Sequence, residues 1–462
     1  MKHLYRFKQL ILATGDVSVF FIAFCLSLVI RYAGIPSFEL ITKNIQAFFF
    51  AFLLWIVVNY INGLYDVRLI HSDGRYKRII EAALFSLIVG VIFFYIRPDR
   101  DITPKTILIL TVIIGYTFAA LWRILYNSLI GDKKLQTSVI FVGIIEETNE
   151  LIQILNKEKN IGYYVPAIFD ISGQWKSSAT FDIEMYHDVS QLENAIKKYR
   201  PQVIVTSAEA GNNAQVVKTL YHLLFSSIVL TDLFSFYETV TGRISPATFS
   251  ESWFLKNIRS ADRPVYDKLR RLIDIIIASA LSFVLGLILI IIAPLIKLTS
   301  KGPLFFKQER IGQNGKLFWI YKLRTMHVLS KDGSAETAGF EFAKKDDKRI
   351  TPIGKMLRKS RIDELPQVLN LFKGDITFIG PRPERPEIVE KLTEHMPYYP
   401  LRETVKPGIT GWAQIHQHYT DTLETSLQKL QYDLFYIKNR SFLLDLSILL
   451  KTINVVMRGM GQ

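Results

Sequence analysis

The chain is poor in the residues that form disulfide bonds and soft metal sites. Its 462 residues include one cysteine, Cys25, and eight histidines that are scattered without the spacing of metal ligands. A single cysteine can form no intrachain disulfide, and nothing in the pattern indicates an oxidising compartment. A zinc site is not indicated either, because such sites need clusters of Cys and His.

The chain also lacks the modules of nucleic-acid-binding proteins, although its formal net charge is +14. It has no zinc-finger spacing and no aromatic RNA-binding signature. Hydrophobic residues make up 49% of the chain, and much of the positive charge lies beside long apolar blocks. The composition therefore favours a membrane protein whose partners are anionic lipid and phosphorylated substrates, and no nucleic acid.

Four apolar stretches in the first third of the chain are long enough to cross a bilayer, which takes roughly 20 residues per helix. They lie at about 10–31, 46–64, 79–97 and 106–128 and predict a four-helix transmembrane domain over residues 1–132. The first stretch is too long for a signal peptide and lacks a clear cleavage site. It contains Asp16 close to one end, and we expect that carboxylate at the membrane interface.

Lys and Arg residues in the short flanks predict the orientation of these helices. One side carries ten of them and the other carries five. The richer side has Lys2, Arg6, Lys8, Arg68, Arg75, Lys77, Arg78, Arg123, Lys133 and Lys134, and the other has Arg31, Lys43, Arg97, Arg100 and Lys105. We therefore expect both ends of the domain in the cytoplasm.

Residues 136–262 are more polar and alternate strand-like runs (138–142, 165–170, 203–206, 227–230) with helix-like runs (149–157, 191–199, 215–225). The alternation predicts a parallel sheet with covering helices. Only Gly143 follows the first strand, where a dinucleotide site would need a Gly-x-Gly-x-x-Gly fingerprint. Nucleotide binding by this domain is therefore not expected.

A fifth apolar block, Leu272–Leu298, is also long enough to span a membrane. Basic residues stand on both sides of it: Arg263, Lys268, Arg270 and Arg271 before, and Lys297, Lys301, Lys307 and Arg310 after. Both flanks therefore favour the cytoplasmic side. Because Pro294 can break the helix and let the chain turn back, we predict a re-entrant membrane hairpin over 264–298 rather than a full crossing.

Two adjacent carboxylates, Asp363 and Glu364, lie in a very basic segment. Pro366 suits a first helical turn, and the apolar spacing predicts a helix that ends at Gly374. The amino end of such a helix would keep both carboxylates ionised and would attract an anion. On its own, such a pair is more often a capping group.

Five motifs accompany this pair in a fixed order: Phe306–Gly312, Tyr321–Met326, Gly374–Asp375, Gly380–Glu384 and Lys406–Trp412. Together they resemble the bacterial sugar transferase family, the monotopic polyprenyl-phosphate hexose-1-phosphate transferases, over about residues 264–462. Segments 237–243 and 252–255 resemble the linker of the family's larger members. The resemblance implies an α/β membrane protein with four spans, a Rossmann-like cytoplasmic module at 136–262, a re-entrant helix, and a mixed α/β catalytic domain at 299–462.

The same resemblance implies transfer of a hexose 1-phosphate from a UDP-sugar to undecaprenyl phosphate, with release of UMP. The reaction would start exopolysaccharide, capsule or O-antigen synthesis on the cytoplasmic face of the bacterial inner membrane. Asp363 would be the nucleophile that forms an aspartyl-phosphosugar, with Glu364 as its metal-orienting or proton-handling partner. Hard oxygen ligands and a diphosphate substrate suit Mg²⁺, held by Asp363 and Glu364 and with Asp375 as a further candidate.

Phosphate-binding candidates come from three places. Arg382 stands between Pro381 and Pro383, and in the family this Pro-Arg-Pro element contacts the nucleotide. On a strand, Lys322 and Arg324 would share one face and could clamp phosphate. The basic residues Arg358, Lys359 and Arg361 could instead bind phosphate or anionic lipid, or form a solvated face.

Other assignments stay open at this point. Trp412 is expected near the active site and could lie at the lipid interface. A membrane-anchored NAD-dependent nucleotide-sugar dehydratase is one alternative function, disfavoured by the missing glycine fingerprint and by the absence of a Tyr-x-x-x-Lys pair in the middle domain. A non-catalytic scaffold for polysaccharide assembly is another, disfavoured by the intact Asp363-Glu364 and Arg382 elements. The sequence selects no particular sugar, and a homodimer is plausible.

Overall fold

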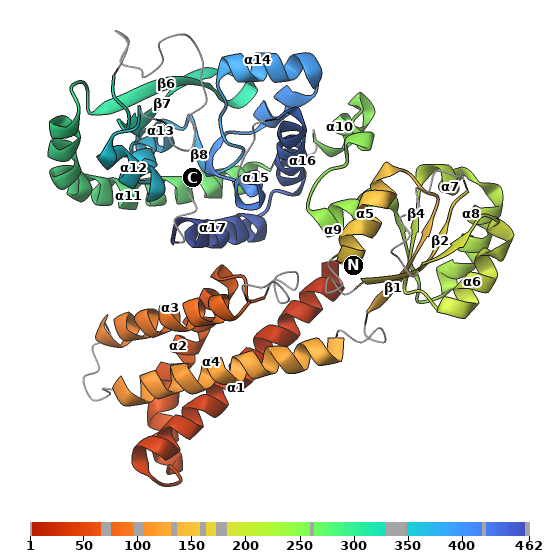
Figure 1. Cartoon of the computed structure of the whole chain (residues 1–462), viewed down its shortest axis with the longest axis horizontal. Coiled ribbons are helices and arrows are strands. Elements are labelled where there is room, and N and C mark those ends of the chain that lie inside the picture. The colour runs from red at the N-terminus through yellow and green to blue at the C-terminus, as the bar shows by residue number, and fades with distance from the viewer. Residues whose placement is uncertain are drawn as a thin grey trace. The chain divides into compact units, whose positions relative to one another are not determined.

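The computed structural model describes residues 2–65, 75–96, 105–130, 136–157, 163–171, 183–258, 263–328, 347, 349–417 and 422–457. The predicted domain ends at 1, 132, 262 and 462 lie outside these residues, as do the flanking charges Arg68, Arg97, Arg100, Lys133 and Lys134. Contacts within the chain divide it into two compact units, Met1–Thr241 and Gly242–Gln462. Figure 1 shows the elements of both units.

The first unit begins with four long apolar helices, α1 (Lys2–Tyr32), α2 (Phe38–Ile61), α3 (Arg75–Ile96) and α4 (Lys105–Ile130). Each contains a stretch that is long and apolar enough to cross a membrane. Aromatic side chains fill the core between them, among them Phe20, Phe24, Phe48, Phe52 and Trp55. With α11 of the second unit, five such helices occur in the described ranges, as expected for a membrane protein.

Asp16 lies inside the core of these helices. Its side chain is fully buried, and its two oxygens accept hydrogen bonds from Nη1 and Nη2 of Arg123 at 2.9 and 2.8 Å. Tyr65 Oη and Asn59 Nδ2 donate to the same carboxylate at 2.9 and 3.0 Å. An ion pair and two further hydrogen bonds therefore replace water around the Asp16 charge inside the helix core.

The hydrogen bonds around Asp16 continue through all four helices. Tyr116 Oη on α4 donates to Asn59 Oδ1 on α2 at 2.7 Å, and its oxygen lies 2.6 Å from Ser86 Oγ on α3. Apolar side chains alone discriminate weakly between helix registers, whereas a buried polar group tolerates few positions of its partner. This network therefore selects one arrangement of the helices.

A parallel sheet of five strands follows in the same unit. Its strands are β1 (Thr137–Val142), β2 (Tyr163–Phe169), β3 (Glu184–Tyr186), β4 (Val203–Thr206) and β5 (Val229–Asp232), in the order β3-β2-β1-β4-β5. Alternate residues point to opposite faces. Those on one face pack on α5 (Glu146–Lys157) and α9 (Leu233–Thr241), and those on the other pack on α6 (Leu192–Tyr199) and α8 (Ala214–His222) (Figure 1). The predicted parallel sheet with covering helices is confirmed.

The sequence missed several short elements of this module: β3, α9, α7 (Ala208–Asn212) and the 3₁₀ turn η3 (Val189–Gln191), whereas the predicted run 215–225 covers α8 and the 3₁₀ turn η4 (Leu223–Phe225). The missed elements are too short for periodicity to identify. Gly143, which follows β1 with a φ of 87°, packs directly against Ser207 at the start of α7. A side chain at Gly143 would collide with Ser207, so this glycine serves close packing at the carboxyl ends of β1 and β4.

Residues 242–258, which the sequence assigned to the middle domain, pack in the second unit. Trp412 Nε1 donates to the carbonyl oxygen of Gly242 at 2.9 Å, and the indole ring stacks on Phe435. This segment contains η5 (Pro246–Thr248) and α10 (Glu251–Asn257), and Phe254 of α10 lies in the main core of the unit. Trp412 therefore holds residues 242–258 in place. The sequence suggested only a position near the active site or at the lipid interface for this residue.

Helix α11 (Pro264–Thr299) is assigned as one continuous helix, with Pro294 inside it. The helix does not end at Pro294, and this part of the sequence prediction is corrected. Proline removes one backbone hydrogen bond, but the buried residues Ile292 and Ile296 on either side pack against Leu323 and Leu357 and hold the last turns on the helix. In Figure 1 the ribbon of α11 changes direction toward its C-terminal end.

The rest of the second unit is a mixed α/β domain, as expected. β6 (Phe305–Ile311) and β7 (Leu317–Leu323) form an antiparallel hairpin around η7 (Gln313–Gly315), and β8 (Thr377–Ile379) pairs in parallel with β9 (Gly408–Thr410). The remaining elements are α12 (Pro352–Lys359), η8 (Ile362–Gln367), α13 (Val368–Lys373), α14 (Pro386–His395), η9 (Tyr399–Thr404), α15 (Trp412–His416), α16 (Leu423–Asn439) and α17 (Phe442–Met457).

The buried pair of Asp16 and Arg123 generates a stability prediction. Asp16→Asn leaves the Arg123 charge buried without its counter-ion, and we expect a loss of roughly 3–5 kcal/mol in stability. The double variant Asp16→Leu/Arg123→Met should recover only part of that loss, because an apolar pair needs no solvation but leaves Tyr65 Oη and Asn59 Nδ2 without their acceptor. Thermal unfolding in detergent would measure both, with the exposed Glu39→Gln as control. Unfolding of Asp16→Asn at the wild-type temperature would contradict this role.

Candidate active site

Asp363 and Glu364 lie in η8, which leads directly into α13. The predicted helix end at Gly374 is confirmed, since this glycine terminates α13 with a φ of 81°. The predicted first turn is 3₁₀ rather than α, and it contains Pro366. Both carboxylates point inward from this turn and are less than a tenth exposed.

The carboxylate of Glu364 is held by three cations. Its Oε1 lies 2.8 Å from both Lys322 Nζ and Arg382 Nη2, and its Oε2 lies 3.5 Å from Arg361 Nη1. Burial would raise the pKa of Glu364, but the charges of Arg382, Lys322 and Arg361 outweigh it and hold the pKa well below its usual range. Glu364 is therefore a permanently ionised anchor for these cations.

Asp363 has a different environment from its neighbour. Burial raises the pKa of Asp363, the Glu364 charge raises it further, and Lys322 opposes both effects. Its Oδ1 is buried and has no hydrogen-bond partner in the part of the chain that the structure describes. The two neighbouring carboxylates thus lie in different electrostatic environments. Asp363 keeps a poorly solvated oxygen available for a bond to substrate or metal.

The strand β7 delivers Lys322 to this site, but not Arg324. Lys322 pairs across the hairpin with Phe306, and its ammonium reaches Glu364. Arg324 lies beyond the end of β7, and its Nη2 donates to the carbonyl oxygens of Ile296 and Ser300 at 3.3 and 2.7 Å. The predicted shared face of the two residues is therefore wrong, and the Nη2 group of Arg324 caps the carboxyl end of α11.

The Pro-Arg-Pro loop after β8 is fixed by its carbonyl groups. Prolines have no N–H, so their backbone can be held only through oxygen. Each of three successive carbonyls accepts a hydrogen bond: Pro381 from Gly408 N at 2.8 Å, Arg382 from Arg402 Nη2 at 2.9 Å, and Pro383 from Arg310 Nη1 at 3.2 Å. The guanidinium of Arg382 is left about a third exposed, so it can meet a second anion while it contacts Glu364.

The other predicted residues occupy peripheral roles. Asp375 Oδ2 accepts from Asn370 Nδ2 at 3.1 Å, so this carboxylate is engaged in the turn after α13. Arg358 Nε donates to Thr325 Oγ1 at 2.9 Å, and Lys359 is exposed. Within the described ranges, no group of three or more His, Cys, Asp and Glu residues could hold a metal ion. A metal at the Asp363-Glu364 pair would therefore take its remaining ligands from water, backbone carbonyls or a substrate.

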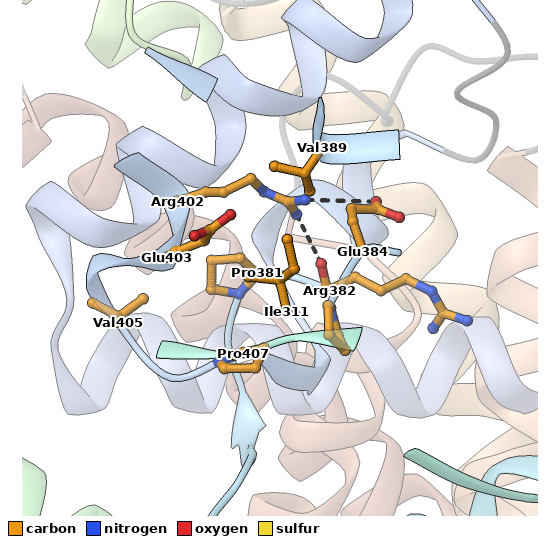
Figure 2. A pocket seen from close by; sticks show the side chains of 11 residues that line it. Ile311, Pro381, Arg382, Glu384, Val389, Arg402, Glu403, Val405 and Pro407 are labelled. Carbon is orange, nitrogen blue, oxygen red and sulfur yellow. Dashed lines mark hydrogen bonds and ion pairs between the residues drawn. The ribbon is translucent and has the colours of Figure 1, made fainter. Parts of the chain in front are cut away.

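A small hollow lies behind the Pro-Arg-Pro loop (Figure 2). Its cavity is about 10 Å³, which suits one water molecule and no nucleotide. It is lined by Ile311, Gly312, Pro381, Arg382, Pro383, Glu384, Val389, Arg402, Glu403, Val405 and Pro407. In Figure 2 the side chain of Arg402 reaches across this hollow to the backbone of Arg382 and to Glu384.

An ionic cluster that was not predicted from the sequence surrounds this hollow. Glu384 binds Lys429 and lies 3.6 and 3.8 Å from Arg402 and Arg310, and Arg402 pairs with Asp433 at 2.7 Å. Burial would raise the pKa of Glu384, but Lys429, Arg402 and Arg310 lower it to about 2. One feature of the sequence does indicate buried charges here: Lys429 and Asp433 lie four residues apart on the apolar face of one helix.

The low pKa of Glu384 generates a pH prediction. Its folded value of about 2 lies below the ordinary 4.5, so between these values the unfolded chain takes up a proton that the folded chain does not. The stability from Glu384 is therefore present above about pH 4.5 and lost as the pH falls toward 2, a change of roughly 3 kcal/mol.

Denaturant unfolding between pH 6 and pH 2 measures this loss. Glu384→Gln should have a lower free energy of unfolding at pH 6 than the wild type, and this free energy should fall less steeply toward pH 2. The exposed Glu390→Gln should follow the wild type. Equal slopes for wild type and Glu384→Gln would contradict the assignment.

Known proteins are similar to this chain in sequence. A family model described as Bacterial sugar transferase matches residues 265–459. The UDP-glucose:undecaprenyl-phosphate glucose-1-phosphate transferase of Klebsiella pneumoniae is 31% identical over 384 residues, which cover 80% of this chain and 78% of that protein. The UDP-galactose-lipid carrier transferase of Erwinia amylovora is 27% identical over 384 residues, which cover 77% of this chain and 76% of that protein.

A third relative matches over a shorter region. The UDP-N-acetylgalactosamine-undecaprenyl-phosphate N-acetylgalactosaminephosphotransferase of Aeromonas hydrophila is 39% identical over 224 residues, 48% of this chain and 51% of that protein. The match thus spans about half of the Aeromonas protein and more than three quarters of the Klebsiella protein. The resemblance inferred from the motifs is confirmed, and the chain belongs to the bacterial sugar transferase family.

Proposed function

We propose that the protein transfers a hexose 1-phosphate from a UDP-sugar to undecaprenyl phosphate and releases UMP, as the first step of exopolysaccharide, capsule or O-antigen synthesis. The observation that carries this proposal is the contrast within the carboxylate pair. Glu364 is anchored by three cations, while Asp363 is buried with an unpartnered oxygen. Relatives named as sugar-phosphate transferases acting on undecaprenyl phosphate support it.

Asp363 supplies the nucleophile in this mechanism. Its Oδ1 attacks the phosphorus that carries the sugar, the bond from that phosphorus to the bridging oxygen breaks, and UMP leaves with the bonding electrons. The product is an aspartyl-phosphosugar. An oxygen of undecaprenyl phosphate then attacks the same phosphorus, the acyl phosphate bond breaks, and the Asp363 carboxylate is restored.

The cations around Glu364 lower the electrostatic cost of this reaction. Both substrates are anions and repel each other and the carboxylates, so preorganised positive charge is needed where they meet. Lys322 and Arg382 share one oxygen of Glu364 and can turn toward the phosphates without leaving it. The planar fork of Arg382 suits phosphate or a uracil carbonyl.

Mg²⁺ is the cofactor that we propose. The carboxylates of Asp363 and Glu364 are hard oxygen donors that fit this ion, and the unpartnered Oδ1 of Asp363 is the oxygen reserved for the phosphorus. Bound there with the substrate diphosphate, Mg²⁺ would neutralise phosphate charge during transfer. Asp375 stays a further candidate ligand, and Asn370 donates to its Oδ2.

We further propose a place for the protein in the bacterial inner membrane, with α1–α4 as four spans and the catalytic domain on the cytoplasmic side. The flanking Lys and Arg residues support this orientation. Helix α11 would enter the membrane and return, because its apolar side chains Phe283, Ile290 and Ile291 are two thirds or more exposed. The change of direction that Pro294 favours suits such a path.

The parallel sheet of the first unit supports a Rossmann-like assignment for this module. From β1 the chain adds β2 and β3 on one side of the sheet and then β4 and β5 on the other side, as in doubly wound folds. We propose a regulatory or oligomeric role for the module, including a possible homodimer. The close packing of Ser207 on Gly143 supports a role other than dinucleotide binding.

The release of UMP tests the proposed function. Purified protein, undecaprenyl phosphate and Mg²⁺ are incubated with a panel of UDP-sugars. We expect release from one or a few donors and a fall of at least about 10³-fold in Asp363→Asn, because the nucleophile is lost. Asp188→Asn, an exposed helix cap that Asn replaces well, is the control and should keep full activity. Substantial activity in Asp363→Asn would refute the role of Asp363.

A further inference from the structure

Arg402 is a buried residue outside the motifs that carry the resemblance, yet it touches the backbone of Arg382. Its side chain is 4% exposed, and all three of its nitrogens are engaged. Nη2 donates to the Arg382 carbonyl at 2.9 Å, Nε and Nη2 donate to Asp433 Oδ2 at 3.0 and 2.7 Å, and Nη1 donates to Tyr399 Oη at 3.0 Å. Figure 2 shows this arginine against the Pro-Arg-Pro loop.

The contact to the Arg382 carbonyl matters because few other groups can hold the backbone of that residue. The prolines on both sides fix their own φ angles and donate no hydrogen bond, so the orientation of the Arg382 side chain depends on where its peptide carbonyl is held. Gly408 and Arg310 hold the neighbouring carbonyls of Pro381 and Pro383. Arg402 holds the carbonyl of the residue that bears the guanidinium.

Asp433 fixes the orientation of the Arg402 guanidinium. It is 1% exposed on α16, between the core residues Leu430 and Leu434, so its position is set by the packing of that helix. Two nitrogens of Arg402 bind one oxygen of Asp433, which aligns the guanidinium plane. Lysine could not replace this arrangement, because its ammonium has no planar fork that reaches three partners at once.

We propose that Arg402, aligned by Asp433, is a positioning residue that sets the Arg382 guanidinium for the phosphates of the nucleotide-sugar donor. This inference rests on the proposed function. It adds that two residues on η9 and α16, which do not contact the donor themselves, control how Arg382 binds it. Arg402 touches neither Asp363 nor Glu364 in the described structure and acts only through Arg382. Its loss should therefore weaken donor binding more than it slows the chemical step.

The kinetic test compares Arg402→Lys and Asp433→Asn with wild type across a range of UDP-sugar concentrations. We expect the KM for the donor to rise about tenfold or more in both variants, with a smaller change in kcat, because Arg382 is displaced by a fraction of an ångström rather than lost. Arg440→Lys is the matched control. It removes another buried arginine, which pairs with Asp267 away from this loop, and should leave the donor KM unchanged.

A second readout does not depend on activity. Hydrogen–deuterium exchange of the peptide covering residues 379–385 should accelerate in Arg402→Lys and stay at the wild-type rate in Arg440→Lys. Unchanged exchange, or faster exchange without a rise in donor KM, overturns the positioning role. If the wild type releases no UMP from any donor, the proposed function fails, and exchange alone then decides whether Arg402 holds the loop.

Discussion

The candidate site depends on one carboxylate, that of Glu364, which balances cations from three separate segments of the chain. Lys322 comes from β7, Arg361 from the turn before η8, and Arg382 from the loop after β8. Without the negative charge of Glu364, these side chains would repel one another and disperse. The anchored charge also distinguishes the two neighbouring carboxylates: Glu364 organises the cations, and Asp363 has a buried oxygen without a hydrogen-bond partner among the described residues.

Two further sets of contacts hold this arrangement rigid. Behind the Pro-Arg-Pro loop, Glu384, Arg402 and Asp433 form a buried cluster that fixes the backbone of Arg382. On the other side, Asp274 of α11 accepts hydrogen bonds from Thr377 Oγ1 and Phe378 N of β8 at 2.7 and 2.8 Å. The strand that precedes the loop is thereby tied to the long apolar helix. A site that must bring a water-soluble donor to a lipid acceptor gains from such a direct connection.

Much of the site could be predicted from the sequence, because Asp363, Glu364 and Arg382 stand in short motifs whose order is specific. The pairing of the supporting residues could not, since Arg402 and Asp433 meet only through tertiary packing, although the place of Asp433 on the apolar face of its helix indicates a buried charge. The same limit explains three features that the sequence did not show. Arg324 follows a strand that ends one residue earlier, Asp16 finds its partner 107 residues away, and neighbouring apolar contacts keep Pro294 within a helix.

The central claim is that Asp363 carries the phosphosugar covalently. It is tested by mass spectrometry of the protein incubated with Mg²⁺ and its UDP-sugar, without acceptor, and then quenched and digested. The account predicts a gain of one sugar phosphate on the peptide that contains Asp363. The adduct should disappear when undecaprenyl phosphate is added and should be absent in Asp363→Asn. An adduct on another residue, or product formation only when both substrates are present and without any adduct, would contradict the account.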